Sequence, residues 1–368
     1  MPAILHILHD FSDNSTTRIA SLIMRALSKR GFRFHAGAVT DKDEASQYLR
    51  AAGVRTVEFF RQKNIVAAIQ HYVRSQDIRI VHSHSPRTAI QGYFALHGQS
   101  SIAHIQTRHL LATPTSRRWG LLYTAADRLS LYLSQTIIPV SKTMEEQIQR
   151  IPGISPSRVI SIQNGVDTDM FFQPQARMEL RKDLGIEPHH KVLIFNGRLE
   201  LMKRLDILLE AFGRIHAEFP EAILVIAGEG SLENELRSFA QSLQIHENVR
   251  WLGFRRDIPS LLAAADIYVQ SSSNEGLSLS ILEAMAAEKT VISTDVGAAR
   301  EVLDHMQTGI IIPPNNPARL AEAFRIALSD PERAQALASR ARMVAKERFS
   351  VERMVDAYAD VYLKSIRA

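Results

Sequence analysis

The chain contains no cysteine, which excludes disulfide bonds, thiolate metal sites and cysteine nucleophiles. No apolar run reaches the roughly 18 residues that a membrane-spanning helix requires. The first residues, MPAILHILHD, have the pattern of a strand rather than that of a signal peptide. We therefore expect a protein of a reducing compartment, by default the cytoplasm.

Length and composition are those of a globular protein with more than one domain. The chain has 368 residues, enough for two cores, with 45% apolar and 23% charged residues. Residues 1–170 carry 20 Lys plus Arg against 12 Asp plus Glu, a net +8, and the remainder carries 24 against 27, a net −3. A basic half indicates an anionic partner. Because no aromatic-rich basic stripe is present, a membrane surface is favoured over nucleic acid.

Apolar runs of strand length alternate with segments of helix length along the whole chain, which predicts parallel sheets with crossover helices. In the first half we expect strands at Ala3–His9, Phe32–Val39, Thr56–Phe60, Ile78–Ser83, Ala103–Thr107 and Gln135–Val140, and the segment Ile160–Asp167 is expected to close the series with a strand and a Gly turn. After a charged connection at Met170–His190, a second series is expected at Val192–Asn196, Ile223–Ala227, Val249–Leu252, Ile267–Gln270, Val291–Thr294 and Gly309–Ile312.

The predicted fold class is therefore α/β, with two Rossmann-like doubly wound parallel-sheet domains and a ligand in the cleft between them, at the carboxyl ends of the strands. We expect the domains at residues 1–168 and 169–350. The tail from Pro331 to Ala368 is helical by pattern, and its last helix, about 351–368, is expected to pack back on the first domain.

The stretch Ser271–Ala286, SSSNEGLSLSILEAMA, joins a predicted strand to a predicted helix. Gly276 allows close approach of a ligand, and the amides at the positive end of the helix dipole then point outward from Leu277, Ser278 and Leu279. This arrangement predicts a phosphate site. It is flanked by Glu275 and Glu283, whose carboxylates suit hydroxyl groups better than phosphate. Together these features indicate a nucleotide sugar.

Three other strand ends in the second half carry residues suited to a diphosphate or a base. After Asn196, Gly197 permits close approach while Arg198 and Lys203 supply donors, although a solvated basic loop has the same composition. Gly228 lies in a turn that is also typical of ordinary strand-to-helix connections. The third strand end offers backbone for a base edge, or a bend beside core aromatics, at Gly253, Phe254 and Arg255.

Together these segments resemble the retaining nucleotide-sugar glycosyltransferases of family four, whose GT-B fold consists of two facing Rossmann-like domains. The resemblance spans the second half in the family's order and is strongest at Ser272–Ala286. The other matching segments are Asn164–Asp167, Gly197–Leu199 with Lys203, Ala227–Gly230, Leu252–Phe254, Val296-Gly297 and Glu301.

The resemblance implies a role for each matching side chain. Arg198 and Lys203 would bind the donor diphosphate, Glu275 would contact hydroxyls of the donor sugar, and Glu283 would hold the ribose. It implies no essential metal or other cofactor, with the nucleoside diphosphate sugar bound as a substrate. It also assigns the donor to the second domain and the acceptor to the first.

The first half resembles the family more loosely, at the strand ends Val81–Ser85, Gln106–His109 and Pro139–Ser141. His109 matches the histidine near the transferring sugar and the leaving phosphate, and His84 is expected to line the cleft. A metal pair formed by His82 and His84 is an alternative, because residues i and i+2 share a strand face, but no carboxylate accompanies it.

The first strand-to-helix turn departs from the family pattern. It usually carries a Gly-Gly pair, whereas His9–Thr17 has no glycine. Its small polar residues nevertheless offer hydroxyls and amides to a phosphate or an acceptor, and the candidates are Ser12, Asn14 and Thr16.

Two further motifs have more than one explanation. Asp167-Thr168-Asp169 spells the D-x-D of a metal-dependent glycosyltransferase fold, but it follows Asn164–Val166 at the domain junction, so we take the match as accidental. The stretch Arg117–Leu133 combines basic, aromatic and leucine positions. Such a stretch suits either an anionic lipid surface or a helix that packs its apolar side on the first sheet.

The predicted function is a retaining glycosyltransferase that moves a sugar from a nucleoside diphosphate donor, most simply a UDP-sugar, to a saccharide or lipid-linked saccharide in polysaccharide or glycoconjugate biosynthesis. Peripheral contact with the inner face of an anionic membrane fits the basic first half. Two alternatives stay open: a nucleotide-sugar epimerase of the same fold, and a non-catalytic nucleotide-sugar-binding subunit.

Overall fold

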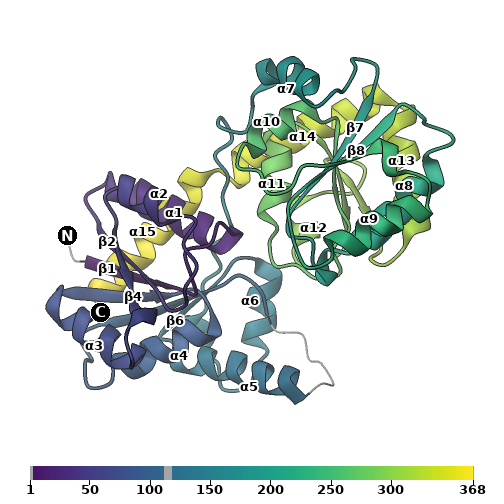
Figure 1. The fold of residues 1–368 in the computed structure, drawn as a ribbon. Coiled ribbons are helices and arrows are strands. Elements are labelled where there is room, and N and C mark those ends of the chain that lie inside the picture. The colour runs from purple at the N-terminus through teal and green to yellow at the C-terminus, as the bar shows by residue number, and fades with distance from the viewer. Residues whose placement is uncertain (1–2, 112–117, 368) are drawn as a thin grey trace. The chain divides into compact units, whose positions relative to one another are not determined.

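The computed structural model describes residues 3–111 and 118–367, with side chains of the second range described from Leu122 onward. It divides into two compact units (Figure 1). Unit 1 comprises the described residues up to Asn164 together with those from Val351, and unit 2 comprises Gly165–Ser350. No helix in these two ranges is long and apolar enough to cross a membrane.

Unit 1 is a doubly wound parallel sheet with the strand order β3-β2-β1-β4-β5-β6. Its strands are β1 Ala3–Leu8, β2 Arg33–Ala38, β3 Arg55–Glu58, β4 Ile78–Ser83, β5 Ala103–Arg108 and β6 Thr136–Pro139. Its helices are α1 Ser15–Ser28, α2 Ser46–Ala51, α3 Ile65–Ser75, α4 Pro86–Ala95, α5 Arg118–Leu133, α6 Lys142–Gln149 and α15 Val351–Arg367.

The elements at the centre of the unit 1 sheet have the sequences that their positions require. Every residue of β1 is buried, as expected for a parallel strand covered on both faces. Helix α1 begins after Asn14, whose Oδ1 accepts from the Thr17 amide at 3.1 Å and so satisfies one of the unpaired amides of the first turn. Helix α15, yellow in Figure 1, packs against α1 and β4 and buries Tyr358 and Tyr362.

Unit 2 repeats the architecture with the order β12-β11-β10-β7-β8-β9. Its strands are β7 Lys191–Asn196, β8 Ala222–Ala227, β9 Val249–Trp251, β10 Ile267–Gln270, β11 Thr290–Thr294 and β12 Ile310–Ile312. Helices lie on both faces (Figure 1): α7 Arg177–Asp183, α8 Leu205–Ile215, α9 Glu233–Ser242, α10 Ile258–Ala264, α11 Leu279–Ala286, α12 Ala299–Val302, α13 Pro317–Ser329 and α14 Pro331–Arg348.

One predicted strand is wrong. Ile160–Asp167 is not a strand, although the amides of Ile160 and Ile162 donate to the carbonyls of Ile137 and Pro139 on β6, both at 3.0 Å. Its one bridge among the described residues joins Val166 to Ser350 and is isolated. The segment leaves the edge of unit 1 to enter unit 2, so it cannot continue the ladder. The predicted connection Met170–His190 contains the short helix α7.

Candidate active site

The turns that carry the donor candidates all follow the carboxyl ends of strands in unit 2. The order of its strands reverses between β7 and β10, which lie side by side although β10 is the fourth strand of the unit. Ligands of doubly wound sheets bind outside the carboxyl ends at such a reversal. The turn after β7 and the turn after β10 therefore meet at the expected position.

Lys203 and Glu275 join these two turns directly. Lys203 Nζ donates to Glu275 Oε1 at 2.5 Å, and Ser272 Oγ donates to the same oxygen at 2.8 Å. The backbone is held in the same place, because Ser271 Oγ donates to the Lys203 carbonyl at 2.8 Å. Both charged side chains are mostly but not fully buried, with 19% and 13% of their surface exposed. They remain open to a ligand at a rigid junction.

Helix α11 starts beside this pair. Its N-cap residue, Ser278, makes no capping bond with its side chain, because Ser278 Oγ instead donates to Gln270 Oε1 at 2.5 Å. Glu283 is buried on the same helix. Burial raises the pKa of Tyr268 on β10, and the charges of Glu275 and then Glu283 raise it further, so both carboxylates lie near this ring.

The glycines of the neighbouring turns pack backbone against backbone. Gly197 donates its amide to the Ala227 carbonyl at 3.0 Å, and Gly228 donates to the Gly253 carbonyl at 2.7 Å. A Cβ on Gly228 would lie 1.9 Å from the Gly197 carbonyl oxygen, and φ is +145° there. Gly297 likewise leaves room for the carbonyls of Glu275 and Gly276. These glycines shape the site by allowing its turns to touch.

The basic and aromatic candidates differ in availability. Arg198 is exposed, and no ion pair is assigned to it in the described ranges. Arg255 forms a two-pronged pair with Asp257, at 2.8 and 2.6 Å, which raises the pKa of Arg255. Phe254 keeps 41% of its surface exposed. Its amide donates to Glu229 Oε1 at 3.1 Å.

Asn196, the last residue of β7, is a site candidate that the sequence did not single out. Its side chain is buried and its Oδ1 has no hydrogen-bond partner among the described residues. Buried acceptors are usually paired, so an unpaired one directly before Gly197 makes Asn196 a candidate to accept a hydrogen bond from a ligand. The sequence could not single out Asn196, because an Asn at the end of a strand is common in ordinary turns, and only the structure shows that its side chain is buried and unpaired.

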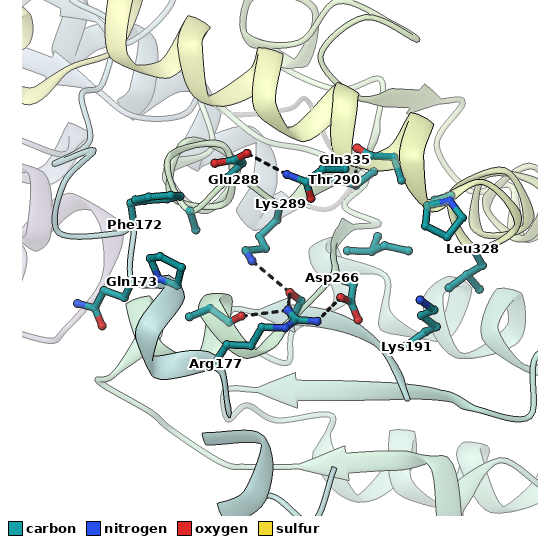
Figure 2. Close-up of a pocket in the computed structure, with 18 residues that line it drawn as sticks. Phe172, Gln173, Arg177, Lys191, Asp266, Glu288, Lys289, Thr290, Leu328 and Gln335 are labelled. Carbon is teal, nitrogen blue, oxygen red and sulfur yellow. Dashed lines mark hydrogen bonds and ion pairs between the residues drawn. The ribbon is translucent and has the colours of Figure 1, made fainter. Parts of the chain in front are cut away.

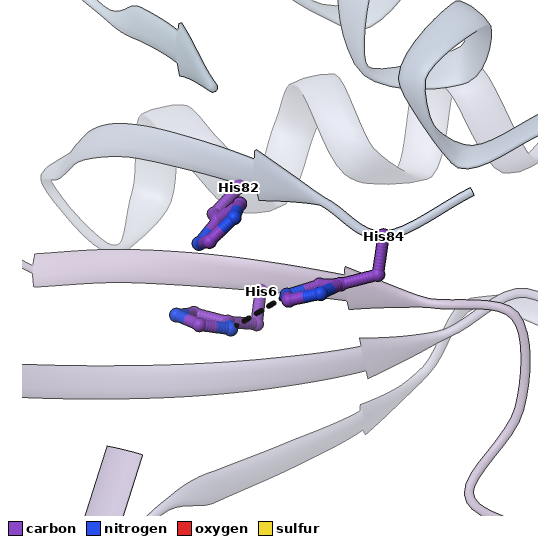
Figure 3. A group of neighbouring side chains, drawn as sticks. All are labelled: His6, His82 and His84. Carbon is purple, nitrogen blue, oxygen red and sulfur yellow. Dashed lines mark hydrogen bonds between the residues drawn. The ribbon is translucent and has the colours of Figure 1, made fainter. Parts of the chain in front are cut away.

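In unit 1, His109 and His84 lie together at the ends of β5 and β4. His84 Nδ1 is 3.2 Å from His109 Nε2, and His84 Nε2 is 2.9 Å from Nδ1 of His6 on β1. His6, His82 and His84 form one buried group (Figure 3). Burial lowers the pKa of each ring, and the charge of Arg108 also lowers that of His109. The rings are therefore neutral near pH 7. His6 was missed, although His6 and His82 are paired in register.

Many polar groups of the glycine-free loop His9–Thr17 form hydrogen bonds within the loop itself. The Ser12 amide donates to Asp10 Oδ1 at 3.0 Å, and Ser12 Oγ accepts from Asn14 Nδ2 at 3.0 Å. Asn14 Oδ1 caps α1, and Thr16 lies half-buried in its first turn. Ser12 and Asn14 thus have structural roles, whatever they contact in a complex.

The first residue of the basic and aromatic stretch, Arg117, lies outside the described residues. Further along α5, large apolar side chains are exposed at Leu122, Tyr123, Leu129 and Tyr132. In the D-x-D segment, Asp167 Oδ1 accepts from the Met170 amide at 2.9 Å, as in an ordinary turn.

A cavity of about 370 Å³ lies at the opposite, amino ends of the unit 2 strands, lined by Lys191, Ile267 and Thr290 (Figure 2). Two of its cations are already engaged. Arg177 and Lys289 donate to the terminal carbonyls of α10, and Arg177 also pairs with Asp266 at 2.6 Å. These contacts cap a helix end, which is a structural role remote from the donor turns.

Comparisons with known proteins agree with this geometry. Residues 17–170 match the family described as Glycosyltransferase Family 4, and residues 176–344 match the one described as Glycosyl transferases group 1. The chain belongs to the group 1 glycosyltransferases of family four. This family is retaining and binds nucleotide sugars.

Individual relatives align with most of the length of this glycosyltransferase. The putative glycosyltransferase EpsD of Bacillus subtilis is 29% identical over 304 residues, which cover 80% of this chain and 78% of EpsD. The UDP-Gal:alpha-D-GlcNAc-diphosphoundecaprenol alpha-1,3-galactosyltransferase of Escherichia coli is 24% identical over 341 residues, 90% of this chain and 87% of that enzyme. The crystal structure of Anabaena HepE in complex with UDP and glucose has a TM-score of 0.87 at 20% identity and covers 98% of both chains. This similarity establishes the GT-B fold.

Proposed function

We propose that this glycosyltransferase moves a sugar from a UDP-sugar to a hydroxyl of a saccharide or lipid-linked saccharide. Unit 2 binds the donor in this proposal, and unit 1 binds the acceptor. The choice of UDP as the nucleotide of the donor is supported by the HepE complex with UDP and glucose and by the name of the E. coli relative. That name also supports a lipid-linked acceptor.

The observation that carries the proposal is the pair formed by Lys203 and Glu275 at the reversal of the strand order. An ammonium group has three donors, so Lys203 can keep its bond to Glu275 and still bind a phosphate oxygen. Glu275 has a second carboxylate oxygen to accept from a sugar hydroxyl. One ion pair can therefore contact both the diphosphate and the sugar.

Departure of the diphosphate requires that its growing negative charge be neutralised. Arg198, Lys203 and the amides at the start of α11 supply positive charge and donors for this step. We assign the ribose to Glu283 and the base to the turn at Gly253–Arg255. The leaving phosphate takes the acceptor proton, so the proposal includes no protein general base, and His109 contacts the transferring sugar.

The test combines calorimetric titration with UDP and transfer of labelled sugar from UDP-glucose, UDP-galactose and UDP-N-acetylglucosamine. Lys203→Met is expected to weaken UDP binding at least about tenfold, because it removes a charge-assisted bond. Glu275→Gln is expected to keep UDP affinity within about threefold but lower transfer about 100-fold, because its bonds matter most in the transition state. Glu218→Gln, which breaks the exposed pair with Arg325 on the same unit, is the matched control.

Ordinary turnover by both site variants would refute the assignment. A new sugar isomer formed from the donor alone would favour an epimerase. UDP binding without transfer across the acceptor panel would favour a non-catalytic subunit.

We also propose that α5 lies on anionic lipid. Leu122, Leu129 and Tyr132 follow the spacing of one helix face and expose 55%, 46% and 43% of their surface, with Arg128 exposed beside them. Leu129→Glu should reduce sedimentation with phosphatidylglycerol vesicles but not alter UDP binding. Phe94→Glu on α4, where Phe94 is 53% exposed, is the control. Equal loss in both variants would contradict a specific role for α5.

A further inference from the structure

The hydrogen bonds that start at His109 continue through His84 and His6 to helix α15. His6 Nε2 lies 3.1 Å from the Tyr362 hydroxyl, which lies 2.8 Å from His82 Nδ1. His82 Nε2 lies 2.8 Å from Thr107 Oγ1, and Thr107 Oγ1 lies 3.1 Å from the Tyr358 hydroxyl. One unbranched chain of hydrogen bonds therefore connects Tyr358 to His109, and all its links lie within unit 1. We call it the His109 chain.

The donors of the His109 chain must all point the same way. Each of its histidines is neutral, so one ring nitrogen donates and the other accepts. Each hydroxyl between two rings donates once and accepts once. If any single link were reversed, two donors or two acceptors would face each other, and a buried polar group would stay unsatisfied.

The far end of the chain sets this direction. Tyr358 is 1% exposed, and in the described ranges its hydroxyl is assigned one partner, Thr107. When Tyr358 donates to Thr107, every link has one donor and one acceptor. In the opposite direction Thr107 donates to Tyr358, and the phenolic proton has no acceptor in a buried position. The chain therefore runs from Tyr358 toward His109, whose Nε2 is the final acceptor.

We propose that Tyr358, Tyr362, His6 and His84 are positioning residues that hold His109 in its Nδ1–H tautomer and in one ring orientation. His109 is partly exposed, and its Nδ1 has no assigned partner among the described residues. It consequently presents a hydrogen-bond donor to its ligand. A donor suits a sugar hydroxyl or a phosphate oxygen and does not suit a general base. This role toward substrate rests on the proposed glycosyl transfer, whereas the tautomer does not.

A metal site is the competing explanation for part of the same cluster. His6, His82 and His84 each offer a ring nitrogen, and these atoms lie within 4.8 Å of one another. However, both nitrogens of each ring already take part in hydrogen bonds of the His109 chain. A metal ion would have to break several of them, and no carboxylate belongs to the group.

The test measures two-bond ¹H–¹⁵N correlations of the histidine rings in the substrate-free protein, with His109 assigned by its loss in His109→Gln. The wild type is expected to show the Nδ1–H tautomer at His109. Tyr358→Phe keeps the ring but removes the terminal donor, so both tautomers should appear. Donor turnover should then fall about two- to tenfold in kcat with KM unchanged, because only part of the population is competent. Tyr362→Phe interrupts the chain in the middle and should have the same effect.

Tyr72→Phe is the matched control, since the Tyr72 hydroxyl lies 2.7 Å from His35 Nδ1 in unit 1 without a link to His109. It should leave the His109 signals and kcat unchanged. An Nε2–H tautomer in the wild type, or an unchanged tautomer in both chain variants, would overturn the proposal. So would stoichiometric zinc binding that shifts the signals of His6, His82 and His84. If the tautomers behave as expected but no donor is turned over, the proposed function fails and the His109 chain stands.

Discussion

Acidification to pH 5.5 should destabilise unit 1 selectively, because four of its histidines are buried and neutral: His6, His82, His84 and His104. Burial lowers the pKa of His6 from 6.5 to about 3 and that of His104 to about 4, and it lowers those of His82 and His84 well below 6.5. In the unfolded chain each ring titrates near 6.5. Their contribution is therefore complete above pH 6.5 and is lost as pH falls toward the folded values.

The magnitude follows from linkage. One pH unit below the unfolded pKa, each ring costs about 1.4 kcal/mol, so the four together cost about 5–6 kcal/mol at pH 5.5. A whole domain has a stability of only about 5–15 kcal/mol. Urea unfolding at pH 7.5 and 5.5 can follow each unit separately when it is read by hydrogen exchange and mass spectrometry, because peptides from residues 165–350 report on unit 2 and peptides from Val351 onward or up to Asn164 report on unit 1. A loss below about 2 kcal/mol in unit 1, or equal losses in both units, would refute the reasoning.

Two further changes test the packing of unit 2. Gly228→Ala should abolish UDP binding and lower the unfolding temperature of unit 2, because the new Cβ meets the Gly197 carbonyl at 1.9 Å. Gly213→Ala on α8, where the nearest atom is a side chain at 3.7 Å, should be neutral or stabilising. Lys289→Met should stabilise unit 2 by about 2 kcal/mol at pH 7, because removal of a buried charge gains about 3 kcal/mol and loss of the bond to Ala265 costs about 1. Burial lowers the pKa of Lys289 from 10.5 to about 8, so the stability of the wild type rises as pH increases between about 8 and 10.5. The stability advantage of Lys289→Met should therefore vanish near pH 10. Denaturation curves that differ by a constant amount from pH 7 to pH 10 would contradict this prediction.

The position of the proposed donor site could be predicted because it depends on local patterns. Apolar runs locate the strands, and in a parallel sheet every strand-to-helix turn lies at the same edge. Lys203 and Glu275 were thus both expected near the phosphate site. Their hydrogen bond was not, because it joins residues 72 positions apart and depends on β10 lying next to β7.

The His109 chain could not be predicted for the same reason. His6 and Tyr362 are 356 positions apart, and their contact requires that α15 returns to unit 1 after the whole of unit 2. Sequence patterns also cannot distinguish a glycine that approaches a ligand from one that approaches another turn. Gly228 was expected to lie near the donor, and its missing side chain makes room for Gly197.

The backbone conformation of the loop His9–Thr17 explains why it contains no glycine. In unit 2, Gly197, Gly228 and Gly253 have φ values of +157°, +145° and +63°, which few other residues adopt. No residue of His9–Thr17 has a positive φ, so the loop has no position that requires glycine. Its shape comes instead from the Asp10 carboxylate, which accepts from the Ser12 amide, and from the buried Phe11. Because residues other than glycine line this loop, the proposed acceptor site in unit 1 predicts that the size and polarity of their side chains affect acceptor selection.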